Sequence, residues 1–437
     1  MTSPSGKTMW GIAPAGPLVG DVEIAGSKNV VTKLMAAAVL GNSPSVVLNA
    51  PRIGDVDIST AMLREVGAGV AIEGDTVTVD PTSVAASRVP VVYSALNRFP
   101  VLLVGPLLHR LGEAFVPVVG GDRIGARPID FHIDALRTFG AEVELTPDGL
   151  EAKAARLHGA RIRLPIPSVG ATETVLLTAS MAEGRTVLEN AAIEPEVVEL
   201  ALFLQRMGAR IELRADRRFV IEGVPELRGA RQRVGGDRIE AFSYLVAGVA
   251  TGGRVRIIGC HQDRLVTAIT TLQRMGARFE ISEEGIVAEG RELQPAAVKT
   301  SPHPGFMTDW QSALVVLFTQ VEGLSVVHET VFEDRLVYVD ALRQMGAEIE
   351  LYDQCLVGEA CRFHESQWRH SAVIRGRTQL HGAEIEMPDI RWTFAYVLAA
   401  AVAEGDSIVS GIHHLERGYD HVYDKFTGLG LRITPLT

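Results

Sequence analysis

A sixfold internal repeat constrains the fold more than any other feature of the chain. Each copy reads as the end of an amphipathic helix, then a glycine, then a run in which apolar and polar residues alternate. One copy is Leu63-Arg-Glu-Val-Gly67-Ala-Gly-Val, and another is Leu204-Gln-Arg-Met-Gly208-Ala-Arg-Ile. The repeated glycines lie 68 to 84 residues apart, at Gly67, Gly140, Gly208, Gly276, Gly346 and Gly430. A near-constant period of this kind indicates a fold assembled from similar units.

Each copy predicts the same local structure. The glycine stands where the C-terminus of a helix requires a positive φ, and the alternating run after it is typical of a strand. A second pattern, a small-residue turn followed by a β run, precedes the helix in most copies, as in Glu183-Gly-Arg-Thr-Val-Leu-Glu-Asn190. We therefore predict six mixed α/β modules, each with two helices and about four strands. Six modules of about 70 residues exceed one core, so we expect them to group as three plus three, with a hinge near Arg231 to Gly236.

Composition excludes several classes of protein. The chain has 437 residues, 47% of them apolar and 22% charged, which is enough to bury a large core and argues against disorder. The net charge of -11 argues against nucleic-acid binding, which favours a basic face. No apolar run approaches the roughly 18 residues of a membrane helix, so we expect a soluble, cytoplasmic protein that does not bind a membrane.

Metal and cofactor sites find little support in the sequence. The glycine-rich segments lack the P-loop ending and the dinucleotide fingerprint. The twelve histidines show no His-x-x-x-His pair, and no Cys-x-x-Cys pair occurs. We interpret Cys260, Cys355 and Cys361 as structural residues. The prediction is therefore a protein without a metal and without a cofactor.

Charged insertions in single modules are the best candidates for chemistry, because a structural repeat needs only its core and its turns. Lys28, one of only six lysines, follows Gly26-Ser27 and precedes an apolar helix. A lysine there opposes the helix dipole but suits a bound anion, which backbone N–H groups assist. The alternative is an exposed lysine on a turn.

A second insertion, from Val119 to His132, packs three glycines, two arginines and two aspartates between a β run and a helix that we expect to begin at Pro128. Glycines permit a mobile loop, and arginines donate in pairs to phosphate or carboxylate. An ordinary polar loop is the alternative. In the segment from Pro302 to Gln311, Asp309 is either a helix cap or a base that deprotonates a hydroxyl.

Four further arginines complete the candidate set. The three in the second half of the chain each have an acidic neighbour in sequence, so surface ion pairs explain each of those three singly, but together on an acidic protein the four favour a clamp for a polyanionic ligand. They are Arg98, Arg335, Arg391 and Arg417.

These motifs, in their order and spacing, resemble the enolpyruvyl transferase family over nearly the whole chain. The resemblance is to the UDP-N-acetylglucosamine 1-carboxyvinyltransferases, more than to the related synthase of 5-enolpyruvylshikimate 3-phosphate. The matching strings are Gly26-Ser-Lys-Asn29, Gly125-Ala-Arg-Pro128 with Asp130 and His132, Pro167-Ser-Val-Gly-Ala-Thr172, Gly236-Asp-Arg-Ile239, Pro304 through Thr308-Asp309, Thr330-Val-Phe-Glu333 with Arg335, Asp389-Ile-Arg391, and His414 with Arg417-Gly418-Tyr419.

The resemblance implies an α/β fold of two inside-out α/β barrels, each of three repeated modules, with a cleft between them. One barrel would comprise residues 1–27 and 236–437. The short N-terminal strand region, about Trp10 to Ala25, would join modules four to six in this barrel. The other barrel, residues 28–235, would be inserted into the first and carry the mobile loop 118–128.

The resemblance also implies a reaction. The family moves the enolpyruvyl group of phosphoenolpyruvate onto the 3-hydroxyl of UDP-N-acetylglucosamine, through a tetrahedral phosphoketal, and releases phosphate in the first committed step of peptidoglycan synthesis. Asp309 would be the base, Asp122 the candidate acid, and Lys28, Arg127 and Arg417 would hold phosphoenolpyruvate. The implied set of substrate-binding residues is Lys28, Asn29, Arg98, Arg127, Pro128, Ile129, Asp130, Phe131, Ser168, Val169, Gly170, Asp309, Val331, Arg335, Arg391 and Arg417.

Three departures from the family pattern stand out. Asp122 occupies the position of the loop cysteine that is the acid in most members and the target of fosfomycin. An aspartate offers no thiolate for alkylation, so we expect fosfomycin resistance. Ile166 replaces a nucleotide-contacting lysine, and Phe99-Pro100 and Trp392 are bulkier than the residues usual there.

These departures leave two alternatives open. One is an enolpyruvyl transferase of secondary metabolism that accepts UMP or another uridine nucleotide. The other is an inactive paralogue that binds a nucleotide. The retained Lys28, Asp309, Arg335, Arg391 and Arg417 argue against the inactive paralogue.

Overall fold

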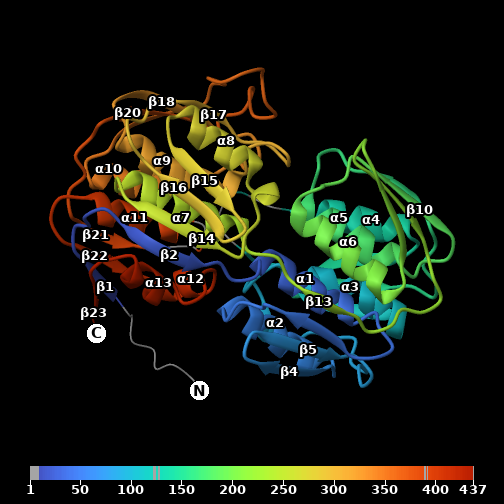
Figure 1. Ribbon diagram of the computed structural model, residues 1–437. Helices are drawn as coiled ribbons and strands as arrows, with labels where there is room; N and C mark the ends of the chain where they lie inside the picture. Colours follow the sequence, from blue (N-terminus) through green and yellow to red (C-terminus); the bar gives the residue numbers. More distant parts are fainter. Residues whose placement is uncertain (1–8, 122–124, 126–127, 388–389, 391, 437) are drawn as a thin grey trace. The chain divides into compact units, whose positions relative to one another are not determined.

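The computed structural model describes residues 9–121, 125, 128–387, 390 and 392–436. The chain divides into two compact units (Figure 1). Of the described residues, unit 1 comprises 9–25, 125 and those from 236 onward, and unit 2 comprises 26–121 and 128–235. Among the described residues, each unit contains three sheets. None of the described helices has the length and apolar character needed to cross a membrane.

Unit 2 is built from six helices and three sheets in its described residues. Its helices are α1 (Lys28–Ala38), α2 (Gly54–Glu65), α3 (Phe99–Leu111), α4 (Asp130–Thr138), α5 (Val169–Ala179) and α6 (Pro195–Met207). Its sheets have the orders β13-β3-β5-β4, β6-β8-β7 and β11-β12-β10-β9. The strands are β3 (Ser45–Leu48), β4 (Gly69–Glu73), β5 (Thr76–Asp80), β6 (Glu113–Pro117), β7 (Glu142–Thr146), β8 (Gly149–Lys153), β9 (Arg161–Arg163), β10 (Arg185–Glu189), β11 (Arg210–Arg214), β12 (Arg218–Glu222) and β13 (Arg231–Arg233).

Unit 1 repeats this plan. Its helices are α7 (Arg238–Ala250), α8 (Val266–Arg274), α9 (Gln311–Thr319), α10 (Val339–Gln344), α11 (Thr393–Val402), α12 (Ile412–Glu416) and α13 (Val422–Gly428). Its sheets have the orders β15-β16-β14-β2, β17-β18-β20-β19 and β21-β22-β1-β23. The strands are β1 (Met9–Ile12), β2 (Val19–Glu23), β14 (Arg254–Ile258), β15 (Arg278–Ser282), β16 (Gly285–Glu289), β17 (Ala297–Lys299), β18 (Gly323–His328), β19 (Glu348–Tyr352), β20 (Ser371–Gly376), β21 (Glu384–Glu386), β22 (Ser407–Ser410) and β23 (Ile433–Leu436).

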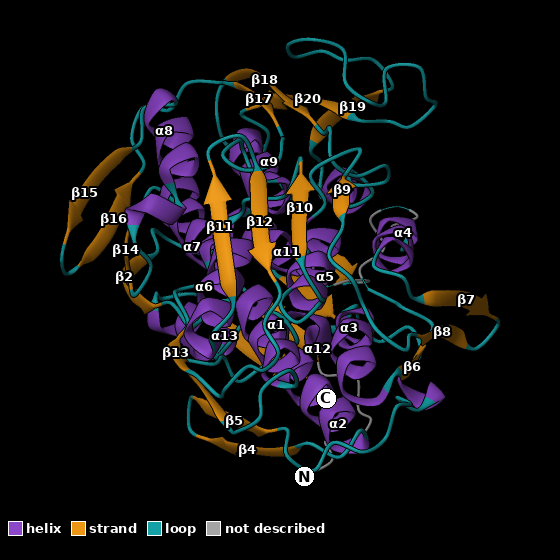
Figure 2. Cartoon of the chain, turned by 90° about the vertical axis from the view of Figure 1, so that its right-hand side faces the viewer, coloured by secondary structure: helices purple, strands orange, loops and turns teal. Residues whose placement is uncertain are grey.

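Within each unit three of the helices lie at the centre, and the sheets lie outside them. Three helices per unit are buried on nearly every side: α1, α3 and α5 in unit 2, and α7, α9 and α11 in unit 1. All nine residues of α9 are buried, for example. Strand residues alternate between buried and less buried positions, as in β5, so one face of each sheet packs on the helices (Figure 2). The predicted fold class, two inside-out α/β barrels of three modules each, is confirmed.

The six repeated glycines end their helices as the sequence predicts. Each adopts a positive φ, between 96° and 113°, and each is followed by the predicted strand, namely β4, β7, β11, β15, β19 and β23. Five sheets have four strands. In the sheet β6-β8-β7 the fourth, parallel strand is reduced to a single bridge between Arg88 and Phe115.

Two local expectations need correction. Pro128 does not begin a helix, because α4 starts two residues later at Asp130. Thr308 and Asp309 do not cap α9 through their side chains. They lie in a 3₁₀ turn, Thr308–Trp310, that leads into that helix, and neither helix start has a side-chain cap.

One hairpin departs from the repeat. The equivalent β4–β5, β7–β8 and β15–β16 connections have two residues each and β11–β12 has three, whereas β19 and β20 are joined by residues 353–370. These eighteen residues contain no helix or strand. They form the long orange loop that projects beyond the sheet in Figure 1. This segment is named the β19–β20 insertion below.

The glycine positions make a stability prediction. Gly428 and Gly430 flank the end of α13, and a Cβ on either would meet nothing within 4 Å, but only Gly430 has a positive φ, of 97°. We expect Gly430→Ala to lower the free energy of unfolding by about 1–2 kcal/mol, because an L side chain is strained at that φ. Gly428→Ala should be neutral or stabilising, since alanine favours helix. Thermal unfolding of both variants checks this, and equal shifts of the two would contradict it.

Candidate active site

In unit 2 the predicted substrate residues lie at helix starts. Lys28 and Asn29 begin α1, Arg98 directly precedes α3, and Ser168 directly precedes α5. Ile129, Asp130 and Phe131 lie around the start of α4, just after Pro128, and Val169 and Gly170 are the first residues of α5. Helix starts present backbone N–H groups and the positive end of the dipole, which is a setting suited to anions.

Contacts within unit 2 bring several of these helix starts together. Arg98 acts electrostatically on both His132, in α4, and Glu173, in α5. Gly170 lies against the His132 ring, because a Cβ added to Gly170 would be 3.0 Å from His132 Cε1. Lys33, in α1, also acts on Glu173. The starts of α3, α4 and α5 therefore surround one buried polar cluster, which α1 borders.

Burial sets the protonation of this cluster. It lowers the pKa of His132 to about 3, so the imidazole is neutral, with Nδ1 2.8 Å from Thr174 Oγ1. Burial raises the pKa of Glu173 to about 7 against the opposing effect of Lys33, and the nearby Glu196 and Glu194 raise it further. Arg98 thus has as neighbours a neutral histidine and a carboxyl group whose pKa is raised to about 7, not two groups of fixed charge.

Lys28 is held by a residue that the sequence did not single out. Its Nζ lies 2.8 Å from Asp55 Oδ2, in the first turn of α2. Both side chains are mostly buried, with 17% and 8% of their surface exposed. An ion pair with so little solvent fixes the ammonium group, which excludes the reading of Lys28 as an exposed turn residue.

In unit 1, Asp309 and Arg335 form a buried pair. Arg335 Nη2 donates to Asp309 Oδ1 at 2.9 Å and to the Thr308 carbonyl at 3.3 Å. The Arg335 side chain is 0% exposed and that of Asp309 is 9% exposed. Arg335 is therefore not a surface residue paired with its neighbours in sequence. Its Nε and Nη1 are buried without a hydrogen-bond partner among the described residues.

Glu329, which no sequence motif indicates, holds together the segments around these two residues. Its Oε1 accepts from the N–H groups of Val331, at 2.6 Å, and Phe332, at 2.9 Å. Its Oε2 accepts from Thr308 Oγ1 at 2.8 Å and from Gln311. Burial raises the pKa of Glu329, whereas Arg335 lowers it. This side chain therefore links the turn before α9 to the loop after β18 that carries Val331.

The remaining predicted residues fall into two groups. Arg417 directly follows α12, two residues before the buried Tyr419, on which Asp309 acts electrostatically. Asp122, Arg127 and Arg391 lie outside the described residues. Gly125, in the predicted mobile loop, is described, is grouped with unit 1, and approaches the Glu333 side chain so closely that a Cβ would clash with it.

The bulky departures from the family pattern point into cores. Phe99 is 4% exposed within the core of unit 2, and Trp392 is 2% exposed within that of unit 1. Ile166, in contrast, is 37% exposed. The added volume at Phe99 and Trp392 is thus accommodated by apolar packing.

The described residues also contain a cluster of metal-ligating side chains, apart from the groups above. His328, Cys355, Cys361 and His370 each offer one ligand atom, and these atoms lie within 4.8 Å of one another. The sequence pattern did not reveal this cluster, because its members come from a strand end and from the β19–β20 insertion.

Comparisons with known proteins agree with this architecture. Residues 12–426 match the family described as EPSP synthase (3-phosphoshikimate 1-carboxyvinyltransferase). Two solved structures share the fold: the enolpyruvyl transferase NikO from Streptomyces tendae, with a TM-score of 0.86, 24% identity and coverage of 99% of both chains, and EPSP synthase from Acinetobacter baumannii, with a TM-score of 0.72, 18% identity and coverage of 98% of this chain and 100% of the other.

Curated relatives are closer in sequence. Proteins named UDP-N-acetylglucosamine 1-carboxyvinyltransferase are 41% identical in Protochlamydia amoebophila, over 96% of this chain and 92% of the relative, and 42% identical in Chlamydia pneumoniae, over 96% and 93%. A third, from Halothermothrix orenii, is 40% identical over 95% and 97%. The repeats, the barrels and these matches together show that the chain belongs to the enolpyruvyl transferase family, alongside the UDP-N-acetylglucosamine 1-carboxyvinyltransferases.

Proposed function

We propose that this protein transfers the enolpyruvyl group of phosphoenolpyruvate to the 3-hydroxyl of UDP-N-acetylglucosamine and releases phosphate, as the first committed step of peptidoglycan synthesis. Identity of about 40% to relatives of that name, over nearly the full length, supports the substrate pair. The observation that carries the chemistry is the buried Asp309–Arg335 pair, because it offers an oriented carboxylate for a hydroxyl proton.

Asp309 is the proposed base. Arg335 and the Glu329 network fix the position of its segment, so the carboxylate is oriented before a substrate arrives. The acceptor hydroxyl loses its proton to Asp309 as its oxygen bonds to C2 of phosphoenolpyruvate and C3 gains a proton. The C3 proton then leaves, the double bond re-forms, and the C2–O bond to phosphate breaks.

Cationic groups stabilise the charge in this scheme. Unit 2 supplies Lys28, which Asp55 orients, and Arg98, at the start of α3. Both are proposed to bind the two polyanionic reactants. Lys28, Arg127 and Arg417 are proposed to hold phosphoenolpyruvate, and Arg391 is proposed to bind substrate beside them. Fixed donors of this kind favour the developing negative charge more than water does, because they need no reorganisation during the reaction.

Asp122 is the proposed acid for C3 in place of the family cysteine. To donate a proton near neutral pH, its carboxyl must have a pKa above the ordinary ~3.9, which burial or a neighbouring anion supplies. A wild-type activity profile with no alkaline limb, together with an unimpaired Asp122→Ala enzyme, would contradict this role.

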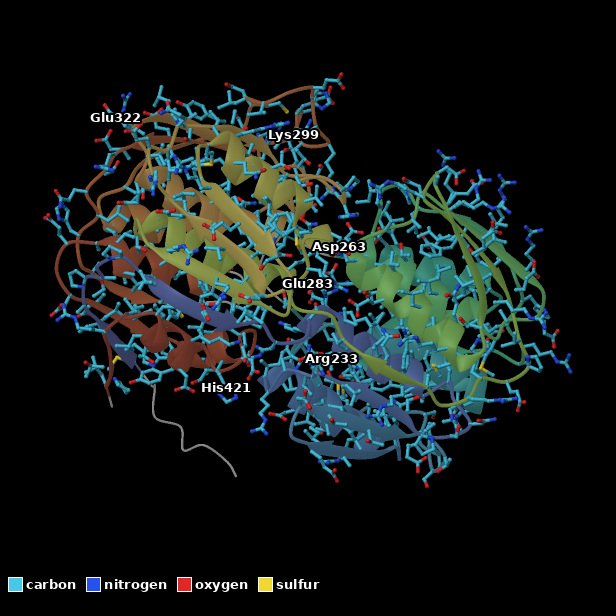
Figure 3. The ribbon with its side chains drawn as sticks, in the orientation of Figure 1. Arg233, Asp263, Glu283, Lys299, Glu322 and His421 are labelled. Carbon is cyan, nitrogen blue, oxygen red and sulfur yellow. The ribbon has the colours of Figure 1, made fainter. Side chains whose placement is uncertain are left out.

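Replacing the proposed base, Asp309, should lower activity without unfolding the protein. We expect Asp309→Asn to lower kcat by roughly 10²- to 10⁴-fold, the range that general-base catalysis supplies. The matched control is Asp263→Asn. Asp263 is also the central residue of a 3₁₀ turn in unit 1, but it is exposed (Figure 3). Steady-state phosphate release measures both variants, and equal activities would sink the assignment.

The acceptor is tested directly by phosphate release from phosphoenolpyruvate. We expect release with UDP-N-acetylglucosamine and none with UMP, because the 3-hydroxyl of the sugar is the proposed nucleophile. Release with UMP alone would instead support a transferase of secondary metabolism. An absence of release with both acceptors would support the inactive paralogue.

Asp122 makes a prediction about inhibition. Since a carboxylate is not alkylated as a thiolate is, intact-protein mass spectrometry should find no fosfomycin adduct on the wild-type chain. The variant Asp122→Cys should gain one adduct. Because the three native cysteines remain in both proteins, they serve as the internal control. A wild-type adduct would show that another residue reacts.

A further inference from the structure

Two cysteines and two histidines come together in unit 1, at the β19–β20 insertion. His328 is the last residue of β18, Cys355 and Cys361 lie in the insertion, and His370 directly precedes β20. Three of them are buried and Cys355 is partly buried. The insertion is the segment that the repeat does not need, since equivalent hairpins in other modules manage with two or three residues.

The spacing of the ligand atoms fits a tetrahedral metal ion. Cys355 Sγ lies 3.5 Å from Cys361 Sγ and 3.5 Å from His370 Nε2. Zinc bound tetrahedrally, with Zn–S near 2.3 Å and Zn–N near 2.0–2.1 Å, places two sulfurs about 3.8 Å apart and a sulfur and a nitrogen about 3.6 Å apart. The two observed separations are close to those values.

Both histidines are turned so that Nε2 is the ligand. Nδ1 of His328 lies 2.8 Å from the Val357 carbonyl, and Nδ1 of His370 lies 2.7 Å from the Trp368 carbonyl. Since a carbonyl only accepts, each Nδ1 carries the hydrogen and each Nε2 has a free lone pair. His328 Nε2 is buried and has no hydrogen-bond partner among the described residues. Backbone carbonyls orient zinc-binding histidines in this manner.

Backbone donors face both sulfurs. The N–H of Cys361 donates to Cys355 Sγ at 3.3 Å, and the N–H of Phe363 donates to Cys361 Sγ at 3.3 Å. The Lys299 ammonium group donates to the Glu359 carbonyl at 3.1 Å and so lies over the same insertion (Figure 3). Amide and ammonium donors stabilise thiolates, which are the form of cysteine that binds metal.

We propose that His328, Cys355, Cys361 and His370 form a structural zinc site. Two sulfurs and two imidazoles are the ligand set of structural Zn²⁺, and four protein ligands leave no position for a reacting water. The site departs from the expectation of a protein without a metal. No short motif indicates the site, because the cysteines are separated by five residues and His328 lies 27 residues before Cys355.

The proposed role is to fasten the insertion. Eighteen residues without a helix or strand have little hydrophobic core of their own, and a bound metal supplies folding free energy in its place. The adjacent residue carries the effect further: Arg362 Nη2 lies 2.6 Å from Glu333 Oε1. Glu333 lies between Val331 and Arg335, which are both proposed substrate residues. By ordering Arg362, the metal would therefore also stabilise the segment that carries these two residues.

Metal content tests this proposal on the full chain, expressed in zinc-supplemented medium. We expect about one zinc per chain by mass spectrometry of the metal in the wild type and a loss of at least tenfold in Cys361→Ser. The matched control is Cys260→Ser. Cys260 is also a buried free cysteine of unit 1, but it donates to the Gly236 carbonyl and lies outside the cluster, so this variant should retain its zinc.

Cobalt provides a second readout that does not depend on the variants folding. The wild-type chain loaded with Co²⁺ should show a sulfur-to-cobalt charge-transfer band together with the absorption of a tetrahedral ion. A wild-type chain with neither zinc nor this band would overturn the proposal. So would a Cys355–Cys361 disulfide in the freshly purified protein, or zinc retained undiminished in a folded Cys361→Ser variant.

Discussion

The burial of three apolar helices at the centre of each unit is the constraint from which the rest of the structure follows. A helix such as α9, buried along its whole length, has no face for solvent and must be enclosed by other elements. The sheets supply that enclosure with their apolar faces. Polar groups are consequently displaced to the helix ends, and the helix starts are where Lys28, Arg98 and Asp309 occur.

The buried charged groups at those helix starts are compensated by neighbouring groups. Arg335 is fully enclosed, yet Asp309 and the nearby Glu329 compensate it, and Glu329 in turn accepts from two backbone amides. In unit 2 the same problem is met differently, because His132 is neutral and Glu173 titrates near neutrality. A carboxylate without partners in either place would cost several kcal/mol, so these networks hold the polar segments in one geometry.

The sequence predicts the repeated helix and strand pattern well, but it predicts poorly which side chains pair across long distances in the chain. Gly67 and its five equivalents follow from local chemistry, because a helix end and the strand after it are encoded within a few residues. Asp55 is invisible beside Lys28, since the two lie 27 residues apart and meet only when α1 packs on α2. The roles of Glu329 and His328 are not visible in the sequence for the same reason, because their partners are distant in the chain. The sequence leaves Asp309 open between a cap and a base, and its pairing with Arg335, 26 residues later, is likewise not visible in the sequence.

The sheet β21-β22-β1-β23 has a consequence for the order of folding. Strand β1, near residue 10, is hydrogen-bonded between β22 and β23, which lie about 400 residues later. The ribosome makes β1 about 400 residues before its two partner strands, so β1 waits unpaired while unit 2, which has its own core, is made. This sheet of unit 1 can therefore form only after unit 2 has been synthesised, and until then β1 must be kept from pairing with other strands.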